Sequence, residues 1–411
     1  MSTIRTLLIP VSSNFFARNF LRTDAFRMLR EDKGVRLVLL THPSKVPYYQ
    51  KIFGGERVLV DALPSVRGFF SEWLFQIIEL SSIVTRRAHM DQVTFLFREG
   101  EAHSILRTLA RLPLFLTKRL FRIIGYAGQP WRFLLRAAYR RYPSEHFRDI
   151  FLRYRPDAVF TPTMVFAEDY VLLREAKRRD IATVGMVFSW DTFYSKTFLR
   201  LHPDRLLVQT GKIKEQAVRF GDYPEEKITV TGITQYDRYF KKEGIVPREE
   251  FFKKIEADPR KKLILYAFSG KAGLAIDLDI IDILHEALAN GEIQESVEVL
   301  LRPYPRFDFS SEKLEKLRRR YGFRGEPCTS AIGTSRGEWE MDDEALSLLT
   351  NSLAHADLVI TMYSTFFIEA AIFDKPLIAV AFDGYKHYDY WNSALQSGGV
   401  PEPLFLPRGI F

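Results

Sequence analysis

Short apolar runs alternate with longer amphipathic segments along almost the whole chain. Each run is rich in leucine and β-branched residues, long enough for a buried strand and too short for a helix. The runs lie at 6–11, 36–41, 57–60, 158–161, 183–188, 205–208, 228–231, 262–268, 298–302, 357–361 and 377–382. Segments with helical spacing separate them, for example residues 17–31, 168–179, 212–220, 278–289, 311–321 and 343–355. Strands that alternate with helices in this way predict parallel sheets of the α/β type.

Two interruptions of this alternation indicate how the chain is organised. Residues 65–155 are mainly helical and are predicted to form an insert in the first array of strands. Residues 241–250, KKEGIVPREE, are charged and contain glycine and proline, as linkers do. We therefore expect a first domain over residues 1–240, a linker at 241–250 and a second domain over 251–411.

Composition restricts the class of protein. With 411 residues, 46% of them hydrophobic, the chain is long enough for two well-packed cores. The single cysteine, Cys328, excludes an internal disulfide and a thiolate metal cage, and it fits a reducing cytoplasm. Residues 7–11 form only a short apolar run, typical of a first strand rather than a signal peptide, and no apolar stretch approaches the roughly 20 residues of a membrane span.

Positive charge is concentrated in the first third of the chain. Residues 1–150 hold 24 basic and 12 acidic residues, whereas residues 151–411 hold 35 and 39, which together give the net charge of +8. Between residues 102 and 144 there are nine basic residues and no acidic one. The segments LRTLARLPLFLTKRLFRIIG and PWRFLLRAAYRRY have the spacing of basic amphipathic helices. This pattern favours an anionic membrane surface, on the inner face of the membrane, or a lipid-phosphate substrate. The alternative is a helical layer whose arginines are solvated or paired. Nucleic acid is not expected, since no helix-turn-helix, zinc-finger or RNP-like signature accompanies the charge.

A strand, a tight turn, a helix and a second strand follow one another over residues 356–384, ADLVITMYSTFFIEAAIFDKPLIAVAFDG. The turn holds Tyr363, Ser364 and Thr365, and backbone N–H groups and hydroxyls at a helix N-terminus bind phosphate. Glu369 lies about one turn further along, where a carboxylate can accept from sugar hydroxyls. The alternative is a buried unit in which Ser364 only caps the helix.

This segment resembles the donor-nucleotide segment of the GT-B glycosyltransferases and of their relatives, the UDP-N-acetylglucosamine 2-epimerases and the CDP-glycerol glycerophosphotransferases. In those proteins a small or hydroxyl turn leads to a helix with a Glu-Ala pair, here residues 369–370, and then to a Lys-Pro strand, here from residue 375. The resemblance implies that Tyr363, Ser364 and Thr365 hold the diphosphate and that Glu369 holds the ribose. The Gly-Gly pair of the epimerase turn is absent here. The resemblance also implies a GT-B-like fold of two doubly wound, Rossmann-like domains.

A second resemblance lies at residues 228–237. ITVTGITQYD is similar to the VTGN…D signature with which the 2-epimerases close their first domain, although Ile233 stands in place of the asparagine. Gly232 is expected to adopt a positive φ and to turn the chain toward the cleft between the domains. The alternative is that Gly232 is only a turn residue.

Two further strand ends are candidate phosphate sites. Relatives show Arg/Lys-x-His-Pro where this chain has Arg302-Pro-Tyr304-Pro, so Arg302 is expected to clamp a phosphate through two donors. Ser269 and Gly270 form a second possible phosphate turn. A Walker A motif is rejected, because position 265, where that motif has a glycine, is Leu265.

The candidate catalytic bases are carboxylates that follow strands. Asp191 comes after the apolar run 183–188, and open α/β sheets bind ligands at the carboxyl ends of their strands. An inverting sugar transfer needs one base to deprotonate the acceptor hydroxyl. Glu168 occupies the corresponding place after the run 158–161 and is the rival base, while Asp191 could merely cap a turn. Lys196 is a candidate for neutralising phosphate.

The predicted function is metal-independent sugar transfer from a nucleotide-sugar donor to a saccharide or lipid-linked acceptor of the cell envelope, by a cytoplasmic protein that associates peripherally with the membrane. No cofactor is expected, and the eight histidines include no HxH or HxxxH pair suited to a metal. Three alternatives stay open: a CDP-glycerol glycerophosphotransferase-like enzyme, a UDP-N-acetylglucosamine 2-epimerase-like protein and a catalytically silent nucleotide-binding scaffold. The chain ends where GT-B proteins usually have a further helix, so that helix is expected to be missing.

Overall fold

The computed structural model describes residues 4–66, 70–84, 105–269, 274–304, 311–326, 340–362, 364–380, 382 and 384–386. The chain divides between Thr234 and Gln235 into two units, each with its own sheet and core. The expected linker at 241–250 falls inside the second unit. There the amide of Asn351 donates to the Gly244 carbonyl at 2.9 Å and its oxygen accepts from the Val246 N–H at 2.9 Å. These hydrogen bonds tie the 241–250 segment to a helix of unit 2. The ending that was expected to lack a helix lies outside the described residues.

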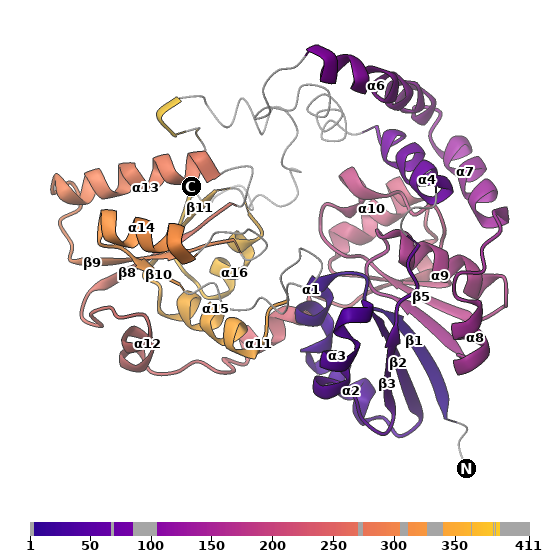
Figure 1. Ribbon diagram of the computed structural model, residues 1–411, viewed down its shortest axis with the longest axis horizontal. Helices are drawn as coiled ribbons and strands as arrows, with labels where there is room; N and C mark the ends of the chain where they lie inside the picture. The colour runs from indigo at the N-terminus through magenta and orange to yellow at the C-terminus, as the bar shows by residue number, and fades with distance from the viewer. Residues whose placement is uncertain are drawn as a thin grey trace. The chain divides into compact units, whose positions relative to one another are not determined.

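Unit 1 contains a seven-stranded parallel sheet in the order β3-β2-β1-β4-β5-β6-β7 (Figure 1). The strands are β1 (Arg5–Pro10), β2 (Val35–Thr41), β3 (Val58–Ala62), β4 (Ala158–Thr161), β5 (Ala182–Met186), β6 (Arg205–Val208) and β7 (Ile228–Val230). The order reverses between β1 and β4. Ligands of doubly wound sheets bind at such a switch point, outside the carboxyl ends of the strands.

Helices cover both faces of this sheet, and successive strand residues point to opposite faces. Leu8 packs with α8 and α9, whereas its neighbour Ile9 packs on the face covered by α1 to α3. Strands that are buried on both faces read as continuous apolar runs, which is why the sequence pattern located them. The helices are α1 (Asn14–Phe16), α2 (Asp24–Glu31), α3 (Val46–Ile52), α8 (Arg148–Tyr154), α9 (Ala167–Lys177) and α10 (Gly211–Gly221).

The helical insert of unit 1 comprises α4 (Phe70–Ser81), α6 (Ile105–Gly125) and α7 (Gln129–Arg141), which lie together in Figure 1. Two buried glutamates of α4 attach it to the rest of the unit. Glu72 accepts from Arg174 of α9 at 2.7 Å and from the Tyr139 hydroxyl at 2.9 Å. Glu79 pairs with Arg200 at 3.1 Å. Both arginine side chains are fully buried, so these ion pairs lie inside the unit and not on its surface.

Unit 2 is a second, smaller parallel sheet in the order β10-β9-β8-β11-β12, with its switch point between β8 and β11. Its strands are β8 (Lys262–Ala267), β9 (Val297–Arg302), β10 (Arg324–Gly325), β11 (Leu358–Met362) and β12 (Leu377–Val380). Helices α12 (Arg248–Lys254), α15 (Asp343–His355) and α16 (Phe366–Ile372) pack on one face, and α13 (Leu274–Ala289) and α14 (Ser311–Tyr321) pack on the other. The short helix α11 (Asp237–Phe240) opens the unit.

The predicted fold class is confirmed: the chain is α/β and GT-B-like, with two doubly wound, Rossmann-like sheets and a helical insert in the first. Every predicted run forms a strand. The two-residue strand β10 was not predicted, because two residues carry no periodic signal. The first predicted helix, 17–31, is divided into a π-helical turn (Ala17–Leu21) and α2, with Thr23 between them in extended backbone.

Candidate functional site

The loops at the switch point of unit 1 are joined by a buried carboxylate. Asp169, in the first turn of α9, is completely buried. One of its oxygens accepts a hydrogen bond from the Ser12 hydroxyl at 2.5 Å, and the other accepts from the Thr163 hydroxyl. Ser12 follows β1 and Thr163 follows β4, so Asp169 connects the two loops that border the switch point.

Burial raises the pKa of Asp169 to about 7, and the hydrogen bonds from Ser12 and Thr163 oppose this rise. A carboxyl group that titrates near neutrality can exchange a proton at physiological pH, and such groups concentrate at functional sites. The adjacent Glu168 is also buried, and its negative charge contributes to the raised pKa of Asp169. The structure therefore adds Asp169 to the candidate residues at this edge of the sheet.

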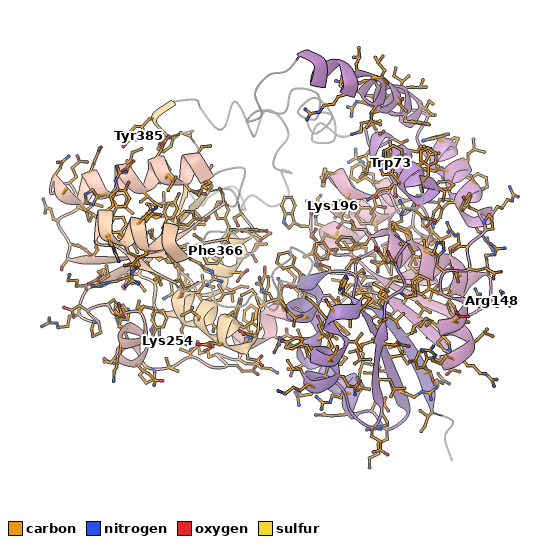
Figure 2. The ribbon with its side chains drawn as sticks, in the orientation of Figure 1. Trp73, Arg148, Lys196, Lys254, Phe366 and Tyr385 are labelled. Carbon is orange, nitrogen blue, oxygen red and sulfur yellow. The ribbon has the colours of Figure 1, made fainter. Side chains whose placement is uncertain are left out.

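Asp191 and Lys196, both singled out from the sequence, form an ion pair. The Asp191 Oδ1 atom accepts from Lys196 Nζ at 2.7 Å and from the Ser189 hydroxyl at 2.5 Å. The Lys196 ammonium also donates to the Ser189 hydroxyl at 2.9 Å and lies 5.4 Å from the centre of the Phe188 ring. These residues follow β5, the neighbour of β4, so the pair shares the carboxyl edge of the sheet with Asp169 (Lys196 is labelled in Figure 2).

Gly232 has the positive φ that the sequence predicted, +77°, and a Cβ atom there would meet open space. It follows β7, where the Thr231 N–H donates to the Val208 carbonyl at 2.8 Å. Two residues later the Thr234 hydroxyl donates to the Asn19 carbonyl at 2.7 Å. The turn at Gly232 thus brings the end of unit 1 beside the helical turn that follows β1.

In unit 2, a second aspartate fixes the loop after β8. Asp277, in the first turn of α13, accepts from the N–H and the hydroxyl of Ser269 at 3.0 Å and 2.8 Å, and from the Tyr266 hydroxyl at 2.9 Å. Burial raises the pKa of Asp277. Ser269, a predicted phosphate contact, therefore has its hydroxyl directed to Asp277 in this structure. Gly270 lies outside the described residues.

Arg302 ends β9 and is buried against a carboxylate. Its Nη1 atom pairs with Glu326, which follows β10, and the other oxygen of Glu326 accepts from the Ser352 hydroxyl of α15. A phosphate that binds Arg302 would share the guanidinium with Glu326 or displace it. The phosphate role of Arg302 remains a prediction.

The turn between β11 and α16 contains Ser364, whose hydroxyl oxygen accepts from the Phe366 N–H at 3.2 Å. Ser364 thus holds the first N–H of α16, although the N-cap position itself is occupied by Thr365, which makes no capping hydrogen bond with its side chain. Thr365 is exposed, and Tyr363 lies outside the described residues. Whether this turn also binds phosphate remains a prediction.

Glu369 of α16 is 4% exposed, and its Oε2 atom accepts from the Tyr239 hydroxyl of α11 at 2.7 Å. The phenol fixes the orientation of the carboxylate. A carboxylate held in this way can accept from a ribose hydroxyl only if the ligand approaches its remaining acceptor positions. The carboxylate of Glu369 is therefore held in one orientation by the Tyr239 hydroxyl, and its contact with a ribose remains a prediction.

The predicted site residues fall into two groups, one in each unit. Unit 1 brings Asp191 and Lys196 into direct contact. Unit 2 places Ser269, Arg302 and Ser364 at the carboxyl ends of three strands that are adjacent in the sheet, β8, β9 and β11. Within the part of the chain that the structure describes, no cluster of three or more His, Cys, Asp or Glu side chains could hold a metal ion.

Three residues of these sites were missed from the sequence. Asp169 was missed because it is adjacent to Glu168, the predicted candidate, in a helix that is buried on nearly every side. The apolar pattern could not tell which of the two acids faces the switch point. Glu326 follows a strand of two residues that gives no pattern. Tyr239 lies 130 positions from Glu369 in the sequence, and no local signal connects them.

Comparisons with known proteins yield similarity of structure alone. No protein-family model matches the chain, and no curated protein matches it. The chain is similar to a UDP-GlcNAc 2-epimerase from Neisseria meningitidis bound to UDP-GlcNAc (10% identity, 96% of this chain and 86% of that chain covered, TM-score 0.47). It is also similar to a glycosyltransferase from Rickettsia africae ESF-5 (12%, 93% and 81%, 0.47) and to the ADP-heptose lps heptosyltransferase II of E. coli (10%, 94% and 87%, 0.34). These overlaps are loose, and the fold class rests on the strand orders of the two sheets.

Proposed function

We propose that this chain is a metal-independent glycosyltransferase that moves a sugar from a nucleotide-sugar donor to a saccharide or lipid-linked acceptor of the cell envelope. The observation that carries the proposal is the carboxyl edge of the unit 2 sheet, where Arg302 ends β9 and Ser269 and Ser364 follow the adjacent strands β8 and β11. Ligands of doubly wound sheets bind at this edge. Hydroxyls and a guanidinium group suit the oxygens of a diphosphate.

In the proposed donor site, the diphosphate lies at the turn 363–365 and the ribose lies at Glu369. The Tyr239 hydroxyl, 2.7 Å from Glu369, holds the carboxylate in the orientation that the ribose hydroxyls meet. Arg302 stabilises the negative charge that develops on the leaving diphosphate, with Glu326 as its resting partner. Groups held in place before the reaction cost little reorganisation when that charge appears.

In the proposed acceptor site, Asp191 removes the proton of the attacking hydroxyl, and Glu168 is the rival base. The Lys196 ammonium, 2.7 Å from Asp191, holds its carboxylate in one orientation and supplies a positive charge for acceptor phosphate. Asp191 and Glu168 follow the adjacent strands β5 and β4, so either can serve a substrate at the same edge. No covalent intermediate with the protein is part of this mechanism.

Calorimetric titration of the full chain with UDP, CDP and GDP tests the donor site. One of these nucleotides should bind, and Glu369→Gln should weaken it about tenfold or more, because hydrogen bonds to a charged acceptor contribute about 1.5–3 kcal/mol. Glu286→Gln, an exposed change on α13, is the control and should leave the affinity unchanged. Absence of nucleotide binding would overturn the enzyme proposal, and an unchanged affinity in Glu369→Gln would overturn the ribose contact alone.

The base is tested with the matched variants Asp191→Asn and Glu168→Gln. The variant that lacks the base should lose about 10²–10⁴-fold in kcat with its nucleotide affinity unchanged, since the base acts only on the acceptor. If both variants transfer sugar at the wild-type rate, neither residue is the base. Transfer only from CDP-glycerol, or epimerisation of the nucleotide-sugar in the absence of acceptor, would identify one of the alternative activities instead.

A further inference from the structure

The outward face of α6 is apolar instead of polar. Four large aliphatic side chains are 38–69% exposed: Leu112, Leu116, Leu120 and Ile123. Their spacing of four, four and three residues places them in one stripe along the helix. A helix on the surface of a soluble unit ordinarily turns such a stripe toward the core. This stripe points away from it.

Two arginines of the basic segment lie on the inward face of α7 and bind other parts of unit 1. Arg132 and Arg136 both donate to Asp222, at 2.5 Å and 2.8 Å, and Arg136 also donates to the carbonyls of Phe198 and Leu199. These two arginines fasten α7 to the unit. For these two residues the alternative prediction, that arginines of this segment are paired within the protein, is correct.

The outward face of α7 combines apolar and basic side chains. Phe133 and Leu134 are 66% and 60% exposed, and Arg140 and Arg141, which are also exposed, follow on the same side of the helix. Tyr126, in the turn between α6 and α7, is 67% exposed as well. The exposed apolar side chains are thus shared by two contacting helices and do not occur singly.

The start of α4, which contacts α6, adds two aromatic residues. Phe70 and Trp73 are 70% and 49% exposed, with their ring centres 5.5 Å apart, and Trp73 is labelled in Figure 2. Tryptophan beside aliphatic and basic side chains is typical of proteins that rest at the boundary between lipid headgroups and acyl chains.

Basic side chains border this apolar stripe. The Arg119 guanidinium lies 4.9 Å from the centre of the Phe115 ring on the same helix, and the residue is half-buried. The segment 102–144, which contains both helices, has no acidic residue; of its nine basic residues, Arg132 and Arg136 pair with Asp222 on the inward side and do not belong to this face. An anionic surface is the electrostatic complement of such a face.

We propose that the outward faces of α6 and α7, with the start of α4, form a surface that docks on an anionic lipid bilayer. We call it the α6–α7 face. Its aliphatic and aromatic side chains enter the headgroup region, and its guanidinium groups contact lipid phosphates. A second copy of the chain is a poorer occupant, because two faces of equal positive charge repel each other. Among the described helices none is long and apolar enough to cross a bilayer.

Vesicle flotation with the full chain tests the proposal. Binding should be strong to phosphatidylcholine vesicles that contain about 30 mol % phosphatidylglycerol and at least about tenfold weaker to pure phosphatidylcholine, because the basic residues respond to surface charge. Raising the salt from about 0.1 M to about 0.5 M should weaken binding to the anionic vesicles, because it shortens the screening length. Binding that ignores both lipid charge and salt would overturn the proposal, as would no binding at all.

Two pairs of exposed substitutions locate the surface. Arg140→Gln with Arg141→Gln should weaken binding about 25-fold, at roughly fivefold per basic residue. Leu116→Ser with Ile123→Ser should weaken it by a further factor of ten or more, because each side chain loses apolar contact with lipid.

The matched controls lie elsewhere on unit 1: Arg30→Gln, exposed on α2, and Leu152→Ser, 64% exposed on α8, should bind as the wild type does. Circular dichroism and a thermal melt establish that each variant is folded. If the folded face variants bind like the controls, the α6–α7 face is not the docking surface. A concentration-dependent doubling of mass in light scattering that the face variants abolish would identify a second copy as the occupant and overturn the proposal.

Discussion

Replacing Asp169 with Asn should change how the stability of the protein depends on pH. The ordinary pKa of an aspartate, 3.8, applies in the unfolded chain, and burial raises the pKa of Asp169 to about 7 in the folded protein. Between these two values the folded protein keeps a proton that the unfolded chain has released. The wild type is therefore most stable below the lower value and loses stability as the pH rises through the window up to about 7.

The size of this loss follows from the two pKa values. Integrated from about pH 5 to about pH 7.5, it amounts to about 2.5 kcal/mol for one group whose pKa moves by about three units. Asp169→Asn has no titrating group at this place, so its unfolding free energy should fall by that much less over the same range. Urea unfolding of both proteins at the two pH values, followed by fluorescence, measures the difference between the two slopes.

Ser12→Ala is a smaller change that tests the same reasoning if Asp169→Asn does not fold. Ser12→Ala removes a hydroxyl that donates to Asp169 and lowers its pKa, so the folded pKa should rise further and the loss of stability should continue to a higher pH than in the wild type. Equal pH slopes in wild type and Asp169→Asn would refute the reasoning. A wild type that gains stability over Asp169→Asn as the pH rises would refute it as well.

Three further substitutions test the stability of single features, two in unit 1 and one in unit 2. Asp222→Ala should lower the unfolding free energy by about 3 kcal/mol in urea titrations, because it removes the carboxylate that pairs with two guanidinium groups of α7; a loss below about 1 kcal/mol would contradict this. Glu326→Ala should cost about 3–5 kcal/mol by removing the buried partner of Arg302, and a thermal melt that stays at the wild-type temperature would contradict a structural ion pair. Gly232→Ala should cost about 1 kcal/mol because of the positive φ, whereas Gly55→Ala, also in open space but without a positive φ, should be nearly neutral; equal effects in the two would show that strain does not matter at position 232.

The fold was predictable because buried parallel strands leave a continuous apolar signal. The runs 158–161 and 205–208 coincide with β4 and β6, and 311–321 and 343–355 coincide with α14 and α15. The boundary between the units was less accessible, since the 241–250 segment has the composition of a linker. Its backbone is nevertheless tied to unit 2 by Asn351, a contact between residues more than 100 positions apart.

In the candidate site, only contacts between residues close together in the sequence could be predicted. Asp191 and Lys196, five positions apart, were chosen separately and form one ion pair. Glu326 lies 24 positions from Arg302 and Tyr239 lies 130 positions from Glu369, so both pairings depend on tertiary packing. Nor does a pattern of apolar positions show that a polar side chain such as Ser269 will be turned toward an aspartate in the next helix.

The buried ion pairs of α4 have a consequence for attempts to shorten this protein. Glu72 and Glu79 are the carboxylates that accompany Arg174 and Arg200, and both arginines lie in the interior of unit 1. A version of the chain without the insert would leave two positive charges in an apolar interior, at several kcal/mol each. A minimal unit 1 therefore needs compensating apolar replacements at both arginines. Grafting the insert onto another α/β protein requires the two arginines to be transferred with it.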